Sequence, residues 1–241
     1  MTPRSWERWK DRYERRGYRV LAPAWPGLEG EVEALRADPS PLMKLDFKKV
    51  VDHHHRIICG LDRPPIIMGH SIGGAVTQVL LGRGLGVAGI GLATATVKWL
   101  RNLPVSTIRA TGLSRHRFHY AFANTMSRAE SDAVHERYHV PAANRVLFDV
   151  ALAKMRRKAA PLVDFRRPGR APLLLAAFGR DHVVSPAASR DTAAKYTSGT
   201  VAFTCFPDQP HFPGAPGWED TADYALMWAE EHTGAGVPVG A

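Results

Sequence analysis

The chain has 241 residues, of which 45% are hydrophobic, and this is enough for one core with an insertion. Its formal net charge is +9, but no nucleic-acid motif accompanies the basic residues, so we expect no nucleic-acid partner. Cys59 and Cys205 lack metal-ligand spacing and indicate a reducing, cytoplasmic location. No apolar run approaches the roughly 20 residues of a membrane helix, so we expect neither a membrane span nor a secretory signal.

The first part of the chain predicts helices around one strand. The expected elements are a helix capped by Ser5 and ended by Gly17, a strand at 18–22, a short helix at 32–36 and a helix at 44–59. His53, His54 and His55 lie within the last of these helices. Because neighbouring helical side chains point about 100° apart, three in a row cannot converge on one ion. We therefore predict no metal site.

Residues 65–74, with the sequence P-I-I-M-G-H-S-I-G-G, predict a short strand, a tight turn and a helix. Gly69 and Gly73 flank Ser71 as G-x-S-x-G. A sharp strand-to-helix turn strains its central residue and brings the flanking positions together, where glycine fits best. Such a turn presents the serine hydroxyl at the sheet edge and leaves the N–H of Ile72 free to bind an oxyanion. The same motif also arises by chance in glycine-rich turns, but here the strand and helix that it requires are both predicted.

The second part of the chain predicts an insertion followed by renewed alternation of strands and helices. After a strand at 88–93, residues 94–168 show no clear strand, several helix-compatible pieces at 117–125, 128–138 and 144–157, and most of the excess positive charge. We interpret residues 94–168 as a helical cap inserted into a core made of residues 1–93 and 169–241. The charge predicts a solvated surface, the alternative being a basic lid that attracts anionic substrates or a membrane surface. The remaining elements are a strand at 172–178, a helix at 185–196, a strand at 201–206 and a helix at 218–231.

Three predicted loops carry Ser71, Asp181 and His211, each directly after a strand. In an open α/β sheet, ligands bind beyond the carboxyl ends of the strands, so we expect these side chains to meet. The motifs G-H-S-I-G-G, G-R-D-H-V-V and Q-P-H-F, in this order, resemble the serine-nucleophile α/β-hydrolase superfamily. The resemblance implies a mostly parallel sheet with helices on both faces, a helical cap and a Ser-His-Asp catalytic triad. It implies no metal and no organic cofactor.

Other residues compete for these roles. His182 follows Asp181 directly and is poorly placed to be oriented by it. His70 precedes the serine and should point into the protein, while Asp208 lies awkwardly close to His211 in one loop. The alternatives that stay open are that Asp181 only caps its loop and that His211 is an ordinary loop histidine.

Serine at the tight turn favours acyl transfer, because relatives that displace halide or open epoxides have aspartate there. We predict an esterase-like serine hydrolase that acts on a small-molecule acyl substrate, such as a carboxylic ester or thioester. The alternatives are a cofactor-free lyase or perhydrolase with the same fold, and a catalytically impaired binding protein. The side chains of the predicted helix at 117–125 either line the substrate pocket or pack within the cap.

The resemblance fails at the start of the chain. Family members have a strand before the first helix and a His-Gly loop that supplies a second oxyanion donor, whereas only residues 1–4 precede Ser5 here. In the family this strand lies between those matching 18–22 and 66–68, so its absence should leave unpaired edges inside the sheet or draw two strands together. We expect a natural start upstream. The alternatives are the loss of one donor, which costs on the order of 10²–10³ in turnover, or a donor from another loop.

Overall fold

The computed structural model describes residues 1–94, 110–152 and 163–233. Its central sheet has four strands in the order β1-β2-β5-β6, all parallel. The strands are β1 (Ile66–His70), β2 (Ala88–Leu92), β5 (Leu173–Phe178) and β6 (Val201–Phe206). β2 and β5 are buried at every position, as expected for the inner strands of a parallel sheet that is covered on both faces. The predicted strand at 201–206 is confirmed to the residue.

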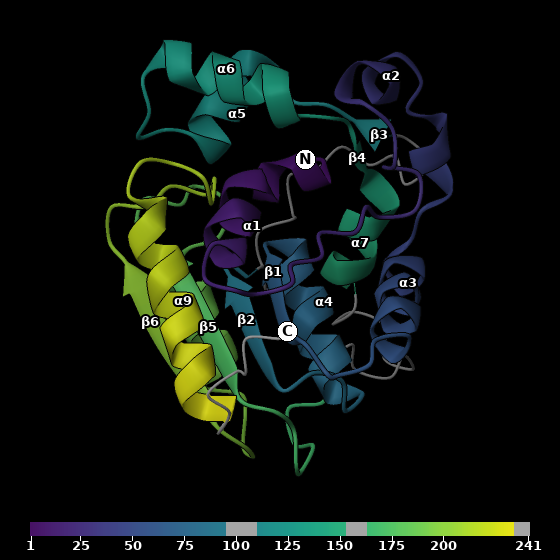
Figure 1. The fold of residues 1–241 in the computed structure, drawn as a ribbon. Helices are drawn as coiled ribbons and strands as arrows, with labels where there is room; N and C mark the ends of the chain where they lie inside the picture. The colour runs from purple at the N-terminus through teal and green to yellow at the C-terminus, as the bar shows by residue number, and fades with distance from the viewer. Residues whose placement is uncertain (95–109, 153–162, 234–241) are drawn as a thin grey trace.

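Helices cover both faces of the sheet, which confirms the predicted fold class (Figure 1). On one face, α4 (Ile72–Gly82) and α8 (Pro186–Ala193) pack on the sheet, and α3 (Phe47–Cys59) packs on α4. Ile67, Leu173 and Leu175 belong to the core on this side. On the other face, α1 (Glu7–Glu14) and α9 (Trp218–Thr233) pack on Ile90 and Leu174. This alternation of buried faces along β5 follows from the pleat of a strand.

The predicted strand at 18–22 is wrong, because these residues form no strand in the structure. Tyr18 and Val20 do turn inward onto the α1/α9 side of the core, and Leu21 is 49% exposed, so the alternation that suggested a strand is real. These residues lack a neighbouring strand, and a β-strand needs one to pair its backbone N–H and C=O groups. Among the described residues, β1 pairs only with β2. The other edge of β1 therefore has no strand partner among these residues, and β1 is an edge strand. Neither expected outcome is seen, because with no strand at 18–22 there are no two strands for the missing one to lie between.

Two predicted helix starts also need correction. Ser5 lies inside a short 3-10 helix, η1 (Pro3–Trp6), and its hydroxyl donates to the carbonyl of Thr2 instead of capping α1. The helix predicted from residue 44 begins at Phe47, where the Asp46 side chain accepts the Lys49 N–H as an N-cap. The residues before it form η2 (Ser40–Lys44), and the predicted short helix at 32–36 is α2 (Val32–Ala37).

Residues 110–152 contain the helices α5 (Arg115–Phe122), α6 (Arg128–Tyr138) and α7 (Asn144–Leu152). The helix predicted at 128–138 is confirmed, and the last residues of the one predicted at 144–157 lie outside the described residues. A two-residue antiparallel pair, β3 (Ala110–Thr111) with β4 (Ala142–Ala143), was not predicted, because two residues show no periodicity. α5 and α6 lie beyond the carboxyl ends of the strands (Figure 1). That these residues form a separate cap domain stays a prediction.

The segment 110–152 is held to the rest of the chain at the end of α6. The Arg137 guanidinium donates to both carboxylate oxygens of Glu7 in α1, at 2.7 and 2.9 Å. The Arg36 guanidinium in α2 donates to the backbone carbonyls of His135 and His139, at 2.6 and 2.9 Å. These contacts fix the C-terminal end of α6 against α1 and α2. Among the described residues, no helix is long and apolar enough to cross a membrane.

Candidate active site

Ser71 stands at the turn from β1 into α4, with φ 55° and ψ −117°. Positive φ is rare for a residue other than glycine and is a typical site of stored backbone strain. The Ser71 N–H donates to the carbonyl of Leu92 at 2.8 Å, which fixes the turn to the end of β2. Among the described residues, the Ser71 side chain caps no N–H of α4, so its hydroxyl is not used to stabilise the helix.

The two flanking glycines of this turn are under different steric constraints. A Cβ atom at Gly69 would lie 2.1 Å from the carbonyl oxygen of Gly73, so no side chain fits at Gly69. A Cβ at Gly73 would meet nothing within 4 Å. The second crowded position is instead Gly74, where a Cβ would lie 2.7 Å from the Thr94 hydroxyl and 3.2 Å from the Gly69 carbonyl oxygen. The predicted need for glycine is therefore confirmed at Gly69, and it is wrong at Gly73, where a side chain would have space.

Ile72 is the first residue of α4, and its N–H consequently has no acceptor within the helix. The N-terminal end of a helix also carries a partial positive charge, which favours an anion there. Ile72 directly follows Ser71, so an oxygen that becomes negative near the serine hydroxyl would lie close to this donor.

Asp181 and His211 form a buried hydrogen-bonded pair. The distance from His211 Nδ1 to Asp181 Oδ2 is 2.6 Å, and both side chains have 0% exposure. The other Asp181 oxygen accepts the backbone N–H groups of Val183 and Val184, at 2.6 and 2.8 Å. A carboxylate with these partners is held as a hydrogen-bond acceptor, and it fixes His211 with a proton on Nδ1.

The pair forms because the loops after β5 and β6 lie side by side. We call residues 179–184 the acid loop and residues 207–217 the histidine loop. The Gly179 N–H donates to the carbonyl of Phe206 at 2.8 Å, and the Arg180 N–H donates to that of Gln209 at 3.0 Å. A Cβ at Gly179 would lie 2.2 Å from the carbonyl oxygen of Pro207, so glycine is required for the close approach of the two loops.

The predicted link from Ser71 to His211 is not a hydrogen bond in the described part of the chain. The Nε2 atom of His211 is buried and has no hydrogen-bond partner there. Hydrogen bonds of this kind are often long without substrate and shorten in the reacting complex. The structure therefore brings together Asp181 and His211, and it places Ser71 at the same edge of the sheet.

The competing residues have other partners. His70 Nε2 lies 2.7 Å from the backbone carbonyl of His211, and the two imidazole rings are 4.6 Å apart. Burial, and after it the charge of His211, lower the pKa of His70 well below 6.5, so the ring is neutral and donates its Nε2 proton. His182 Nδ1 donates to the carbonyl of Tyr120, and Asp208 is exposed. None of these arrangements matches the buried Asp181–His211 pair.

Sequence reasoning left the role of α5 open. Phe118 is fully buried and stacks on Phe122 at 5.1 Å, so it packs within the segment's own core. Phe122 also lies edge-on to the His211 ring, with ring centroids 4.7 Å apart. No local motif could have indicated this contact, since it depends on where α5 settles against the histidine loop.

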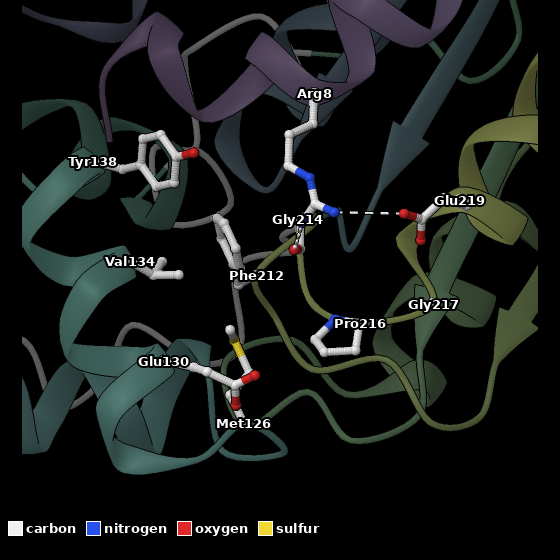
Figure 2. Close-up of a pocket in the computed structure, with 10 residues that line it drawn as sticks. All are labelled: Arg8, Met126, Glu130, Val134, Tyr138, Phe212, Gly214, Pro216, Gly217 and Glu219. Atoms are coloured by element: carbon white, nitrogen blue, oxygen red, sulfur yellow. Dashed lines mark hydrogen bonds and ion pairs between the residues drawn. The ribbon is translucent and has the colours of Figure 1, made fainter.

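Figure 2 shows the residues that line a pocket between the histidine loop and the segment 110–152. The volume of this pocket is about 450 Å³. Met126, Val134 and Phe212 form its apolar wall between α6 and the loop. Arg8 reaches in from α1, where its guanidinium donates to the Gly214 carbonyl at 3.2 Å. Among the described residues, no group of three or more histidine, cysteine, aspartate or glutamate side chains could hold a metal ion.

Comparison of the sequence with models of protein families identifies one family. The sequence model of a family described as "Alpha/beta hydrolase family" matches residues 1–233. A comparison of the sequence with curated proteins gave no match.

Several solved structures share the fold at low sequence identity. A pyrethroid hydrolase from Sphingobium faniae JZ-2 is 18% identical with a TM-score of 0.69, over 97% of this chain and 95% of that one. A monoacylglycerol lipase from Paleococcus ferrophilus is 16% identical with a TM-score of 0.68, over 94% and 89%. A methylesterase from Arabidopsis is 12% identical with a TM-score of 0.66, over 95% and 94%. At these identities the likeness concerns the fold.

Proposed function

Because this chain belongs to the alpha/beta hydrolase family, we propose that it is a serine hydrolase that transfers an acyl group to water. The substrate would be a small carboxylic ester, a thioester or a similar activated acyl compound. The observation that carries the proposal is the fully buried 2.6 Å contact between His211 and Asp181, at the sheet edge where the strained Ser71 turn lies. The esterases and lipases with this fold are consistent with it.

In the proposed first step, the Ser71 hydroxyl attacks the acyl carbonyl carbon while His211 Nε2 takes the hydroxyl proton. Serine is a weak nucleophile unless a base removes its proton during the attack. The carbonyl oxygen becomes negative and is stabilised by the Ile72 N–H at the start of α4. His211 then returns the proton to the leaving alcohol or thiol, which breaks the bond to the acyl carbon and leaves an acyl-serine.

In the second step a water molecule replaces the alcohol. His211 takes a proton from the water as its oxygen attacks the acyl carbon, and it returns that proton to Ser71 as the acid product leaves. Asp181 acts as a hydrogen-bond acceptor in both steps, with one oxygen held by the N–H groups of Val183 and Val184 and the other facing His211 Nδ1. Its role is to hold the imidazole tautomer and to stabilise the imidazolium that forms in each step.

A fluorophosphonate probe tests this proposal, because it labels only activated serine hydroxyls. We expect labelling of the folded protein at Ser71, loss of labelling in Ser71→Ala, and turnover of p-nitrophenyl esters that depends on the same residue. A panel of acyl chain lengths then defines the preferred substrate. Folded protein that neither reacts with the probe nor turns over an ester would refute the hydrolase and favour a binding protein.

A further inference from the structure

The end of α5 and the residues after it contact both loops that carry the proposed acid and base. We call residues 120–124 the clasp. The backbone carbonyl of Phe122 accepts the N–H of Phe212 at 2.8 Å, one residue after His211. The Phe122 ring lies edge-on to the His211 ring, which has 0% exposure. The clasp therefore holds the histidine loop by its backbone and covers the imidazole with an aromatic ring.

The clasp also holds the acid loop on both sides of Asp181. The Asn124 side-chain amide donates to the backbone carbonyl of Arg180 at 3.0 Å. His182 Nδ1 donates to the backbone carbonyl of Tyr120 at 2.8 Å, and the Tyr120 and His182 rings lie 4.6 Å apart. Asp181 lies between two residues that are each tied to the same short segment.

The donors and acceptors around the Asn124 amide nitrogen fit one arrangement, while the Asn124 amide oxygen is buried and has no hydrogen-bond partner among the described residues. With its proton on Nδ1, which donates to the carbonyl of Tyr120, His182 presents Nε2 as an acceptor. It faces the Asn124 amide nitrogen at 3.4 Å, and that nitrogen has a second hydrogen besides the one given to Arg180. The opposite orientation of the Asn124 amide would place its oxygen against two acceptors. Asn124 is therefore the donor that joins the clasp to the acid loop at two points.

We propose that the clasp positions the acid loop and the histidine loop for the reaction, with Asn124 as its main positioning residue. This inference rests on the proposed function. Asn124 lies outside the proposed triad and acts through Arg180 and His182 on the residue between them. Its loss frees the acid loop from the clasp, so that Asp181 holds His211 less accurately. The proton transfer at Ser71 then slows, because small misplacements of reacting groups cost large factors in rate.

The test compares Asn124→Ala with Thr125→Ala. Thr125 is the exposed neighbour of Asn124, so its variant is the matched control. Both variants and Ser71→Ala are assayed with a p-nitrophenyl ester for kcat and KM separately, across pH, and for thermal unfolding. Proton NMR of the folded proteins reports the His211 Nδ1–H directly, since a proton in a short bond to a carboxylate resonates far downfield.

We expect Asn124→Ala to lower kcat by about tenfold to a hundredfold while KM stays unchanged. The downfield resonance should broaden in this variant and stay sharp in Thr125→Ala. A kcat equal to that of Thr125→Ala would overturn the inference, and so would a higher KM with unchanged kcat, which indicates a substrate contact instead. If Asn124→Ala does not fold, His182→Ala removes the other side-chain hydrogen bond between the clasp and the acid loop, and it is judged by the same outcomes. Turnover that survives in Ser71→Ala would refute the proposed function itself, a result distinct from all of these.

Discussion

The unequal crowding of the two glycines around Ser71 gives a sharp prediction about stability. A Cβ in Gly69→Ala would lie 2.1 Å from the oxygen and 2.2 Å from the carbon of the Gly73 carbonyl, and 2.7 Å from the Gly74 nitrogen. All three are backbone atoms in the first turn of α4, so the clash cannot be relieved by rotating a side chain. Overpacking that forces a backbone shift costs about 1–3 kcal/mol and sometimes more. We expect Gly69→Ala to lower the free energy of unfolding by at least about 3 kcal/mol.

Gly73→Ala is the matched control, because it makes the same chemical change at the other flanking position of the motif. Its Cβ would meet nothing within 4 Å, and its φ lies outside the left-handed region. Replacing a helical glycine by alanine stabilises a helix by up to about 1 kcal/mol. Urea unfolding followed by tryptophan fluorescence measures both variants. Equal losses of stability would refute the reasoning, and so would a Gly73→Ala variant that is the less stable of the two.

Three further predictions concern charges and protons. Asp181→Asn should keep the fold and lower kcat for an ester by about 10⁴-fold, because the amide favours the wrong tautomer of His211; a loss under tenfold would contradict that role. The hydrogen bond from Arg137 lowers the pKa of Glu7 below 4.5, so its stabilisation is present above that pH and is lost as the pH falls through the folded-state pKa. Glu7→Gln should therefore reduce the free energy of unfolding by under about 1 kcal/mol at neutral pH, in a partly exposed pair, and the difference should vanish in acid. The pKa of His70 is also lowered, from 6.5. Below about pH 6.5, His70 is protonated in the unfolded chain but stays neutral in the folded protein. Protonation therefore favours the unfolded state, and the wild type should lose stability as the pH falls below about 6.5. His70→Gln should lose less over the same range, and parallel urea-unfolding curves against pH for the two proteins would contradict the assignment.

The elements that the sequence predicts well are those whose pattern is sufficient by itself. β5 is a continuous apolar run between a proline and a glycine, and α4 follows the tight turn with apolar residues at helical spacing. Residues 18–22 alternate between inward-facing and exposed side chains, as a strand does. They nevertheless form no strand, because a strand also needs a neighbouring strand to satisfy its backbone hydrogen bonds. A one-dimensional pattern reports which side chains turn inward. It does not report whether a ladder exists for the backbone.

The residues of the candidate site also divide into those that the sequence could predict and those that it could not. Ser71, Asp181 and His211 could be proposed from the sequence because parallel strands bring their carboxyl ends to one edge, and the structure does join Asp181 to His211. The contacts of Asn124 could not be proposed, since they depend on where α5 comes to rest on two loops distant in sequence. Every residue has a backbone carbonyl, so the contact between Asn124 and the Arg180 carbonyl requires no particular residue type in the acid loop. Such a contact therefore produces no recognisable sequence motif. Residues that position a site through the backbone are thus harder to find from sequence than those that carry out its chemistry, and they require coordinates.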